Sequence, residues 1–336
     1  MPSSDELTGG GGDEPRPSRG DREPLPPRGG DREPLPPYDD EPERRAELRQ
    51  VRAGDVDILV ARYAGYCYGV ERALRITEEA LEAAEGPVAS LGPIIHNPSV
   101  VGHLEARGVK VVDSAGEVKD GTLIVRTHGV PPEVVEGARA RDLNLVDATC
   151  PFVAVAQRKA AGLREAGYAV VILGERDHPE VAGLEGFAGE GAVVVEDAAG
   201  LPLAELHGKR VGVVVQTTQT RTNLAGVAAA LAPVARELLV FNTICDATEK
   251  RQSAAGELAA EVDVVVVVGG RNSANTARLA QLCRAIEGRT HHIESAAELE
   301  PAWFAGARRI GVTAGASTPD AEIEATVAAL QARCGG

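Results

Sequence analysis

Three cysteines of this 336-residue chain stand in the same kind of local setting. Cys150 follows a β-type run and precedes a helical pattern that opens with Pro151, a residue that suits the first helical position. Cys67 and Cys245 also stand close before helical patterns. At the start of a helix, the helix dipole and the free N–H groups favour the thiolate, which is the form that binds metals and reacts. The sequence therefore predicts three thiolates that could act together.

Each of these cysteines is followed by two polar motifs in the same order. The first motif comes 28 or 29 residues after the cysteine, and the second comes 61 to 72 residues after it. The first motifs are HNP at 96–98, HPE at 178–180 and NSAN at 272–275, and the second are THG at 127–129, QTT at 216–218 and AGAS at 314–317. Such an internal repeat predicts three similar lobes around a pseudo-threefold axis. The ends of their strands would then meet at one centre.

The three thiolates could hold either zinc or an iron–sulfur cluster. Structural zinc sites usually contain closely spaced cysteine pairs and a fourth ligand, and no C-x-x-C occurs in this chain. Iron–sulfur clusters are usually held by four thiolates, so three would leave one iron open to a substrate. We interpret Cys67, Cys150 and Cys245 as cluster ligands, and the alternative is three buried structural cysteines. We expect Cys283 in the core and Cys334 to be inert.

The polar residues of the repeat divide into two chemical kinds. Most are neutral or cationic donors near helix starts, and such donors suit a phosphate or diphosphate. These donors are His96, His128, His178, Ser273, Asn275 and Ser317. Glu180 is the carboxylate of the set, so we expect it to donate or relay a proton, with Thr217 and Gln216 extending the relay. Any single one of these residues could instead cap the helix that follows it.

Short β-type runs alternate with helical patterns from about residue 56 onward. The predicted strands cover 57–63, 88–91, 122–126, 143–146, 169–173, 210–215, 238–241, 263–268 and 309–312. The predicted helices cover 70–85, 131–141, 152–166, 223–235, 246–261, 276–287 and 319–332. This alternation predicts an α/β fold of parallel sheets with helices on both faces. We expect α/β lobes over 56–149, 150–244 and 245–333.

Residues 1–50 have a different composition. Proline, glycine and charged residues dominate, and GDREPLPP occurs at 20–27 and again at 30–37. Such a segment buries too little apolar surface to offset the entropy of ordering it. We expect a disordered low-complexity tail, and the alternative is a proline-rich ligand for a partner domain.

Composition limits the classes of function. The chain is 43% hydrophobic but only 3% aromatic, which favours a core of Ala, Val, Leu and Ile. The net charge of −15 argues against nucleic-acid and acidic-membrane partners. We recognise neither a signal peptide nor a membrane span, and five scattered cysteines do not resemble a secreted disulfide framework. We therefore expect a cytoplasmic protein.

Nine motifs, taken in order, resemble the 4-hydroxy-3-methylbut-2-enyl diphosphate reductase family (IspH/LytB), from about Val56 to Asp320. They are GYCYGVERAL at 65–74, GPIIHNPSVV at 92–101, RTHGV at 126–130, DATCP at 147–151, HPEV at 178–181, QTT at 216–218, NTICDATEKRQ at 242–252, GGRNSAN at 269–275 and GVTAGASTP at 311–319. Each motif alone is weak evidence. Their common order and spacing make the resemblance specific.

The resemblance implies a three-lobed protein whose Cys67, Cys150 and Cys245 hold a [4Fe–4S] cluster with one iron lacking a protein ligand. It implies the last step of the non-mevalonate isoprenoid pathway, in which two electrons and two protons remove the 4-hydroxyl of an allylic diphosphate as water. Glu180 would donate the proton, while Thr217 and His178 would orient the hydroxyl. His96, His128, His178, Ser273, Asn275 and Ser317 would hold the diphosphate. A ferredoxin or flavodoxin would supply electrons, because no dinucleotide fingerprint is present.

Three features depart from the family pattern. Ala274 stands where a second serine is usual, and its loss of one hydrogen bond should weaken binding by roughly 0.5–1.5 kcal/mol. Asp177 stands where glycine is common, and the proline-rich tail is not a family feature. A divergent paralogue acting on another hydroxy-diphosphate is therefore a second hypothesis. A non-redox iron–sulfur hydro-lyase is a third, and a cluster-bearing redox sensor or scaffold is a fourth.

Overall fold

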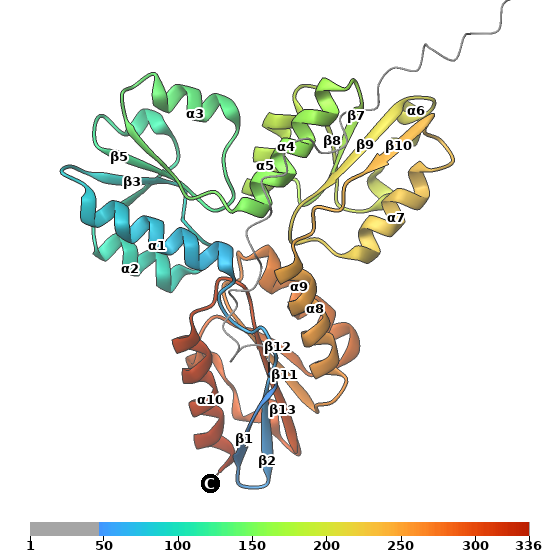
Figure 1. The fold of residues 1–336 in the computed structure, drawn as a ribbon. Helices are drawn as coiled ribbons and strands as arrows, with labels where there is room; N and C mark the ends of the chain where they lie inside the picture. Colours follow the sequence, from blue (N-terminus) through green and yellow to red (C-terminus); the bar gives the residue numbers. More distant parts are fainter. Residues whose placement is uncertain (1–46, 336) are drawn as a thin grey trace, which may run out of the picture. The chain divides into compact units, whose positions relative to one another are not determined.

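The computed structural model describes residues 47–335, all of which lie within one compact unit, Pro34–Gly336 (Figure 1). Most of the predicted tail, including both copies of its octapeptide, lies outside the described residues. The last part of that prediction is corrected, because strand β1 (Arg49–Ala53) already begins at Arg49. β1 pairs antiparallel with β2 (Val56–Val60), whose apolar side chains are mostly buried and hold the hairpin on the sheet.

The described strands form three sheets, in agreement with the prediction of three α/β lobes. The first sheet has the order β4 (Val109–Val112), β3 (Val88–Leu91), β5 (Thr122–Val125), β6 (Asn144–Asp147). The second has the order β10 (Glu237–Val240), β9 (Arg210–Val215), β7 (Ala169–Leu173), β8 (Val193–Val195). The third has the order β1, β2, β13 (Arg309–Ala314), β11 (Val264–Val268), β12 (Thr290–Ile293). Apart from the hairpin of β1 and β2, all pairings are parallel.

The three sheets share one strand order once β2 is counted with the third. β2 pairs with β13 as β6 pairs with β5 and β10 pairs with β9. The prediction that β2 belongs to the first lobe, over 56–149, is therefore wrong for this strand. The alternation of strands and helices indicates that a strand exists here, but it does not indicate which sheet the strand joins. That sheet is determined by pairing with a distant segment, since Asp57 lies opposite Arg309, more than 240 residues later. The remaining lobe boundaries stay a prediction.

Helices follow the strands along the chain and cover the sheets (Figure 1). They are α1 (Tyr68–Ala83), α2 (Pro98–Ala106), α3 (Pro132–Arg139), α4 (Pro151–Glu165), α5 (Pro179–Ala188), α6 (Leu203–Leu206), α7 (Arg221–Leu231), α8 (Asp246–Ala259), α9 (Ala274–Ile286) and α10 (Asp320–Cys334). Every predicted helix and strand is present. The sequence patterns missed β1, β4, β8, β12, α2, α5 and α6, most of which are short. No helix in the described part of the chain is long and apolar enough to cross a membrane.

Each sheet is buried on both faces. In β11, Val264, Val266 and Val268 pack into one apolar cluster, while the alternate residues Val265 and Val267 pack into another. Successive side chains of a strand point to opposite faces, so this continuous valine run is the pattern of a strand between two helix layers. The second cluster also contains the fully buried Cys283, which confirms its predicted place in the core.

Candidate functional site

Eleven of the twelve residues that the sequence singled out as ligands, binders or proton carriers line one pocket of about 710 Å³, its open mouth included. They are Cys67, His96, His128, Cys150, His178, Glu180, Thr217, Cys245, Ser273, Asn275 and Ser317. They follow the carboxyl ends of strands from all three sheets. In parallel sheets these ends share one edge, which is where ligands bind. The predicted convergence is therefore confirmed.

The three cysteines have equivalent positions in the backbone. Cys67, Cys150 and Cys245 are the N-caps of α1, α4 and α8, as predicted. Each cysteine N–H also donates to a carbonyl of the neighbouring polar turn: Cys67 to Ala316 (3.2 Å), Cys150 to Thr127 (2.9 Å) and Cys245 to Thr217 (3.1 Å). Cys67 is thus bound to the third sheet, although it lies first in the chain. The same hydrogen bond, repeated three times, aims each helix start at the pocket.

The thiols lie close to one another. A Cβ atom at Gly69 would stand 2.6 Å from the Sγ of Cys150 and 3.9 Å from the Sγ of Cys67, so only glycine leaves room between them. Burial raises the pKa of Cys150, and the neighbouring Cys67 and Cys245 raise it further. Burial likewise raises the pKa of Cys245 to about 11. The expected ionisation of the free thiols is therefore wrong for these two, because desolvation and mutual repulsion outweigh the helix starts.

This environment indicates what kind of group the thiols could hold. Cys150 and Cys245 resist ionisation beside their neighbours, so a group of compensating positive charge is needed before these thiols can become thiolates together. The pocket also keeps space beside them, because Gly69 carries no side chain there. A multi-iron group fits this donor set, since thiolate is the ligand that iron–sulfur clusters use.

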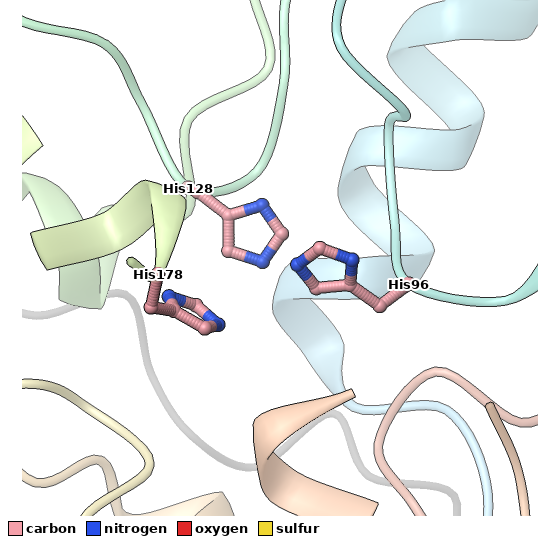
Figure 2. Close-up of side chains that lie close together, drawn as sticks. All are labelled: His96, His128 and His178. Carbon is pink, nitrogen blue, oxygen red and sulfur yellow. The ribbon is translucent and has the colours of Figure 1, made fainter. Parts of the chain in front are cut away.

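Three histidines from three loops face one another beside the thiols (Figure 2). The ring centroids lie 4.5 Å apart for His96 and His128, 5.5 Å for His96 and His178, and 5.3 Å for His128 and His178. Burial lowers the pKa of His96 and of His178 to about 4, and it also lowers that of His128. All three rings are therefore neutral at pH 7. The sequence left open whether these histidines are neutral or cationic donors, and this pocket favours the neutral form.

The ring nitrogens of His178 and His96 differ in their hydrogen bonds, and this difference indicates what each ring can offer a ligand. The Nδ1 atom of His178 accepts from the N–H of Glu180 at 3.1 Å, so in the neutral ring the proton sits on Nε2. Both ring nitrogens of His96 are buried without a hydrogen-bond partner among the described residues. A buried polar group without a partner is costly unless a ligand or water completes it. The cluster therefore has N–H donors to offer to a pocket ligand.

Sequence reasoning missed Arg126, which lies two residues before His128. Its guanidinium lowers the pKa of all three histidines, after the larger effect of burial. The guanidinium packs on Gly92, where a Cβ would collide with it, and Gly92 adopts the left-handed φ of +70°. Its Nε atom is buried without a hydrogen-bond partner in the described part of the chain. Its position beside the RTHGV histidine was the signal that could have identified it.

Glu180 lies at the start of α5 and is almost fully buried. Its Oε1 accepts from the N–H of Thr217 at 2.6 Å, and its Oε2 accepts from the Thr217 hydroxyl at 2.9 Å. Burial raises the pKa of Glu180 to about 7, against the opposing effect of the two Thr217 hydrogen bonds. A carboxyl group with this pKa can hold a proton and release it near neutral pH.

Gln216 does not extend this relay, contrary to expectation. Its Oε1 accepts from the N–H of Glu175 at 2.9 Å, and it does not line the pocket. Gln216 and Thr217 are neighbours directly after β9, but only Thr217 lines the pocket. Gln216 therefore holds the loop that leads to His178.

The third sheet contributes the remaining polar side chains. Ser273 caps α9, its hydroxyl accepting from the N–H of Thr276 at 3.3 Å. Both polar atoms of the Asn275 side chain are buried without a partner among the described residues. The Ser317 hydroxyl donates to the carbonyl of His96 at 3.1 Å. Ala274, the first residue of α9, also lines the pocket. The position at which the family usually has a second serine therefore lies at the site.

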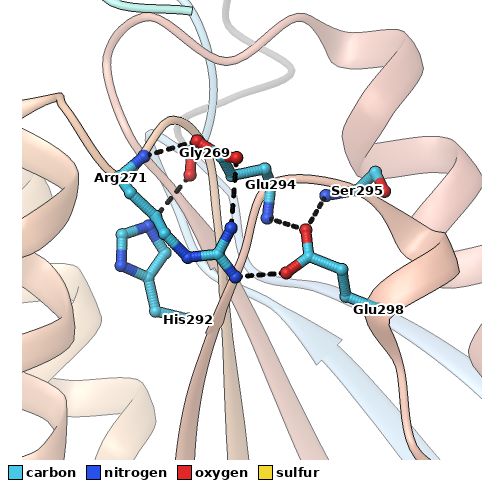
Figure 3. A network of polar contacts seen from close by, with 6 residues as sticks. All are labelled: Gly269, Arg271, His292, Glu294, Ser295 and Glu298. Atoms are coloured by element: carbon cyan, nitrogen blue, oxygen red, sulfur yellow. Dashed lines mark hydrogen bonds and ion pairs between the residues drawn. The ribbon is translucent and has the colours of Figure 1, made fainter. Parts of the chain in front are cut away.

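A polar network supports the loop before Ser273 (Figure 3). The backbone N–H of Arg271 donates to Glu294 at 2.8 Å, and its guanidinium pairs with Glu294 and Glu298. Glu298 also accepts from the backbone N–H of Glu294 at 2.8 Å. The network lies on the surface, so it orders the loop rather than adding much stability.

An adjoining pocket, which shares His96 and His178 with the site, is lined by charged side chains of both signs. They are Glu175, Arg176, Asp177 and Glu196. Asp177 is exposed, so its charge is largely screened by solvent. Glu175 pairs with Arg278 of α9 at 3.0 Å and thereby connects the second sheet's loop to the third sheet's helix.

Comparison with known proteins places the chain in a family. The model of the LytB protein family matches residues 58–331. A Geobacter metallireducens protein named 4-hydroxy-3-methylbut-2-enyl diphosphate reductase is 51% identical over 267 residues, which cover 79% of this chain and 93% of the relative. An Aquifex aeolicus protein of the same name is 44% identical over 286 residues, which cover 84% and 98%.

Two solved structures are similar as well. One, described as (E)-4-hydroxy-3-methyl-but-2-enyl diphosphate reductase, the terminal enzyme of the non-mevalonate pathway, shows 43% identity and a TM-score of 0.62, over 82% of this chain and 99% of that one. The E-1-hydroxy-2-methyl-but-2-enyl-4-diphosphate reductase from Plasmodium falciparum shows 27% identity and a TM-score of 0.75, over 82% and 87%. With its motifs, its three sheets and these matches together, the chain belongs to the LytB family.

Proposed function

We propose that this chain catalyses the reductive dehydroxylation of (E)-4-hydroxy-3-methylbut-2-enyl diphosphate. The reaction takes up two electrons and two protons and yields water with isopentenyl diphosphate and dimethylallyl diphosphate. It is the last step of the non-mevalonate isoprenoid pathway. The observation that carries the proposal is one pocket in which three thiols, three neutral histidines and a buried protonatable carboxyl group meet.

Cys67, Cys150 and Cys245 are the proposed ligands of a [4Fe–4S] cluster. Support comes from their equivalent helix starts, from the approach of Cys67 and Cys150 at Gly69, and from the neighbouring thiols that raise the pKa of Cys150. When bound, such a cluster supplies electrons and, with three protein ligands, one iron that can act as a Lewis acid. We propose a ferredoxin or flavodoxin as the electron donor, because the chain carries no dinucleotide fingerprint of its own.

The proposed diphosphate subsite joins the histidines to the start of α9. His96, His128 and His178 offer N–H donors, and Ser273, Asn275 and Ser317 offer side chains on another wall of the same pocket. The free N–H groups and the dipole of α9 attract an anion as well. Because the histidines are neutral, Arg126 supplies the fixed positive charge behind them. The subsite thus pairs directional donors with one partly buried cation.

Glu180 is the proposed proton donor, and Thr217 is its partner. Once Glu180 is protonated, the hydrogen bond between its Oε2 and the Thr217 hydroxyl can reverse, since a hydroxyl both donates and accepts. The proton can then pass from Oε2 through Thr217 to the leaving hydroxyl of the substrate. The N–H of Thr217 holds Oε1 throughout, so the carboxyl group keeps its orientation. His178, which contacts the N–H of Glu180, helps to orient the hydroxyl.

The decisive experiment is anaerobic turnover of the hydroxy-diphosphate by the reconstituted chain with reduced methyl viologen. We expect viologen oxidation coupled to release of both products. Glu180→Gln should keep the cluster's absorbance yet lose turnover by at least about 100-fold. Water loss or gain without viologen oxidation would instead identify a hydro-lyase. Failure to bind iron, or turnover only of another hydroxy-diphosphate, would contradict the proposal.

A further inference from the structure

Arg251 is the largest of the fully buried side chains in the described part of the chain, with 1% of its surface exposed. It lies in α8, and its guanidinium spans two segments. One nitrogen, Nη2, donates to the carbonyls of Gly65 at 2.9 Å and Tyr66 at 3.1 Å. The other, Nη1, donates to the carbonyl of Ala247 at 3.1 Å.

These carbonyls flank two of the three pocket thiols. Gly65 and Tyr66 directly precede Cys67, which follows strand β2 of the third sheet. Ala247 follows Cys245 by two residues, at the start of α8, which comes after the second sheet. One rigid planar group therefore joins the backbone beside Cys67 to the backbone beside Cys245. A guanidinium can do this because its donors point in fixed, diverging directions.

The backbone conformation of Gly65 also supports this contact. Gly65 has the left-handed φ of +99°, which exposes its carbonyl toward α8 in a turn that few other residues adopt. The guanidinium also brings a positive charge to this contact. That charge lies against the backbone that leads to Cys67 and the backbone that follows Cys245. Neither the proton relay nor the diphosphate subsite uses Arg251.

We propose that Arg251 is a positioning residue for the iron–sulfur cluster. Arg251 holds Cys67 and Cys245 at one separation, and its fixed positive charge stabilises the reduced cluster. This inference rests on the proposed function, because it needs the three thiols to be cluster ligands. It has two separable parts. The hydrogen bonds set how firmly the cluster is held, and the charge sets its reduction potential.

Two substitutions separate these parts. Arg251→Gln removes the charge and most of the donors, while Arg251→Lys keeps a charge but cannot serve three carbonyls in two directions. Arg309→Gln is the matched control. Arg309 begins strand β13, its side chain is 43% exposed and it pairs with Glu261. Each variant is reconstituted anaerobically beside the wild-type chain. The readouts are iron and sulfide per chain, the rate of iron loss to a chelator, and the midpoint potential of the cluster from its electron paramagnetic resonance signal.

We expect Arg251→Gln to lose iron about tenfold faster than the wild-type chain, as is typical when a group supporting a metal ligand is removed. Its midpoint potential should be lower, because the extra electron on the reduced cluster loses a neighbouring cation. Arg251→Lys should also lose iron faster but keep a potential close to the wild-type value. Arg309→Gln should match the wild-type chain in every readout.

Each contrary result has a defined meaning. Wild-type rates and potentials in both Arg251 variants would overturn the inference. If both variants failed to fold without iron, as judged by circular dichroism, while Arg309→Gln folded, Arg251 would be a residue of the fold and the inference would again fall. A wild-type chain that took up no iron would instead contradict the proposed function and, with it, the cluster role of Arg251.

Discussion

At the scale of single residues, environment rather than residue type decides the chemistry of this pocket. Glu180 lies at the start of α5 and Glu175 lies in the loop before it, but only Glu180 is deeply buried. Burial raises the pKa of Glu180 to about 7, whereas Glu175 is partly exposed and pairs with Arg278. A carboxyl group becomes a useful acid near neutral pH only when desolvation disfavours its charged form.

The first prediction concerns the pH dependence of turnover. Glu180 is protonated below its pKa of about 7 and ionised above it, so kcat/KM should fall about tenfold per pH unit on the alkaline side. The histidines stay neutral there, since the pKa values of His96 and His178 are about 4. The measurement is anaerobic turnover between pH 6 and 9 with methyl viologen, whose potential does not depend on pH. A flat alkaline limb would exclude Glu180 as the acid.

The second prediction concerns stability without any cofactor. Because the folded pKa of Glu180 lies above the ordinary value of 4.5, the folded chain binds the proton more tightly between these two pH values. Its ionisation therefore costs stability as pH rises from 4.5, and the full cost is reached above about 7. Glu180→Gln should raise the free energy of unfolding at pH 8, by up to roughly 3 kcal/mol, and leave it nearly unchanged at pH 4. Urea unfolding at both pH values measures this, and equal effects at both would contradict the assigned burial cost.

At the scale of elements, the starts of helices build the site. Among the described residues, α1, α4 and α8 begin directly after the three cysteines, and α5 and α9 begin directly after His178 and Ser273. Proline occupies the first turn of α4 and α5, where its missing N–H is harmless. Each helix thus offers free N–H groups and the positive end of its dipole to the pocket.

The third prediction tests the close approach of the α1 start to the thiols. Gly69→Ala places a methyl group 2.6 Å from the present position of the Cys150 Sγ, so the thiol must move. We expect the variant to fold but to hold less than about half the wild-type iron, since displaced ligands lose affinity steeply. Gly162→Ala in α4 is the control, because nothing lies within 4 Å of the added methyl group. That control should keep full iron and gain up to about 1 kcal/mol of stability. Full iron content in Gly69→Ala would refute the crowding.

At the scale of the whole molecule, the site exists only where the sheets meet. Cys67, Cys150 and Cys245 follow β2, β6 and β10, which belong to the third, first and second sheets in turn, so the chain closes a cycle by returning β13 to β2. Cys67 therefore does not begin the first lobe; it completes the third. Polar contacts also cross between sheets near the pocket, as between Ser317 and His96 and between Arg278 and Glu175.

The fourth prediction follows from this arrangement. A cluster bound by three sheets links segments far apart in sequence, so its removal should lower the unfolding temperature of the whole described fold. Anaerobic calorimetry of loaded and chelator-treated protein measures the difference. Cys150→Ala should abolish the difference, while Cys334→Ser, at the C-terminal end of α10, should preserve it. An unchanged unfolding temperature after iron removal would show that the sheets do not depend on a shared group.

The sequence by itself determined the local structure and the membership of the site. Strand and helix patterns, cysteines before helices and two polar motifs per repeat are local signals, because side-chain periodicity and helix starts depend on neighbouring residues. They were sufficient to name eleven residues that meet in the pocket. The strands β4, β8 and β12 were missed although equally short strands such as β3 were recognised. All three lie at an edge of their sheets, which is a property of the fold that no local pattern records.

Only the tertiary structure decided the rest. It moved β2 and Cys67 to the third sheet, because strand pairing is a contact between distant segments. It showed that His96 and His178 are neutral, that Glu180 holds its proton to about pH 7 and that the free thiols of Cys150 and Cys245 resist ionisation. It also placed Arg126 near the three histidines and Arg251 against the backbone beside Cys67 and Cys245. Desolvation and charge proximity produce these effects, and both depend on which surfaces meet after folding.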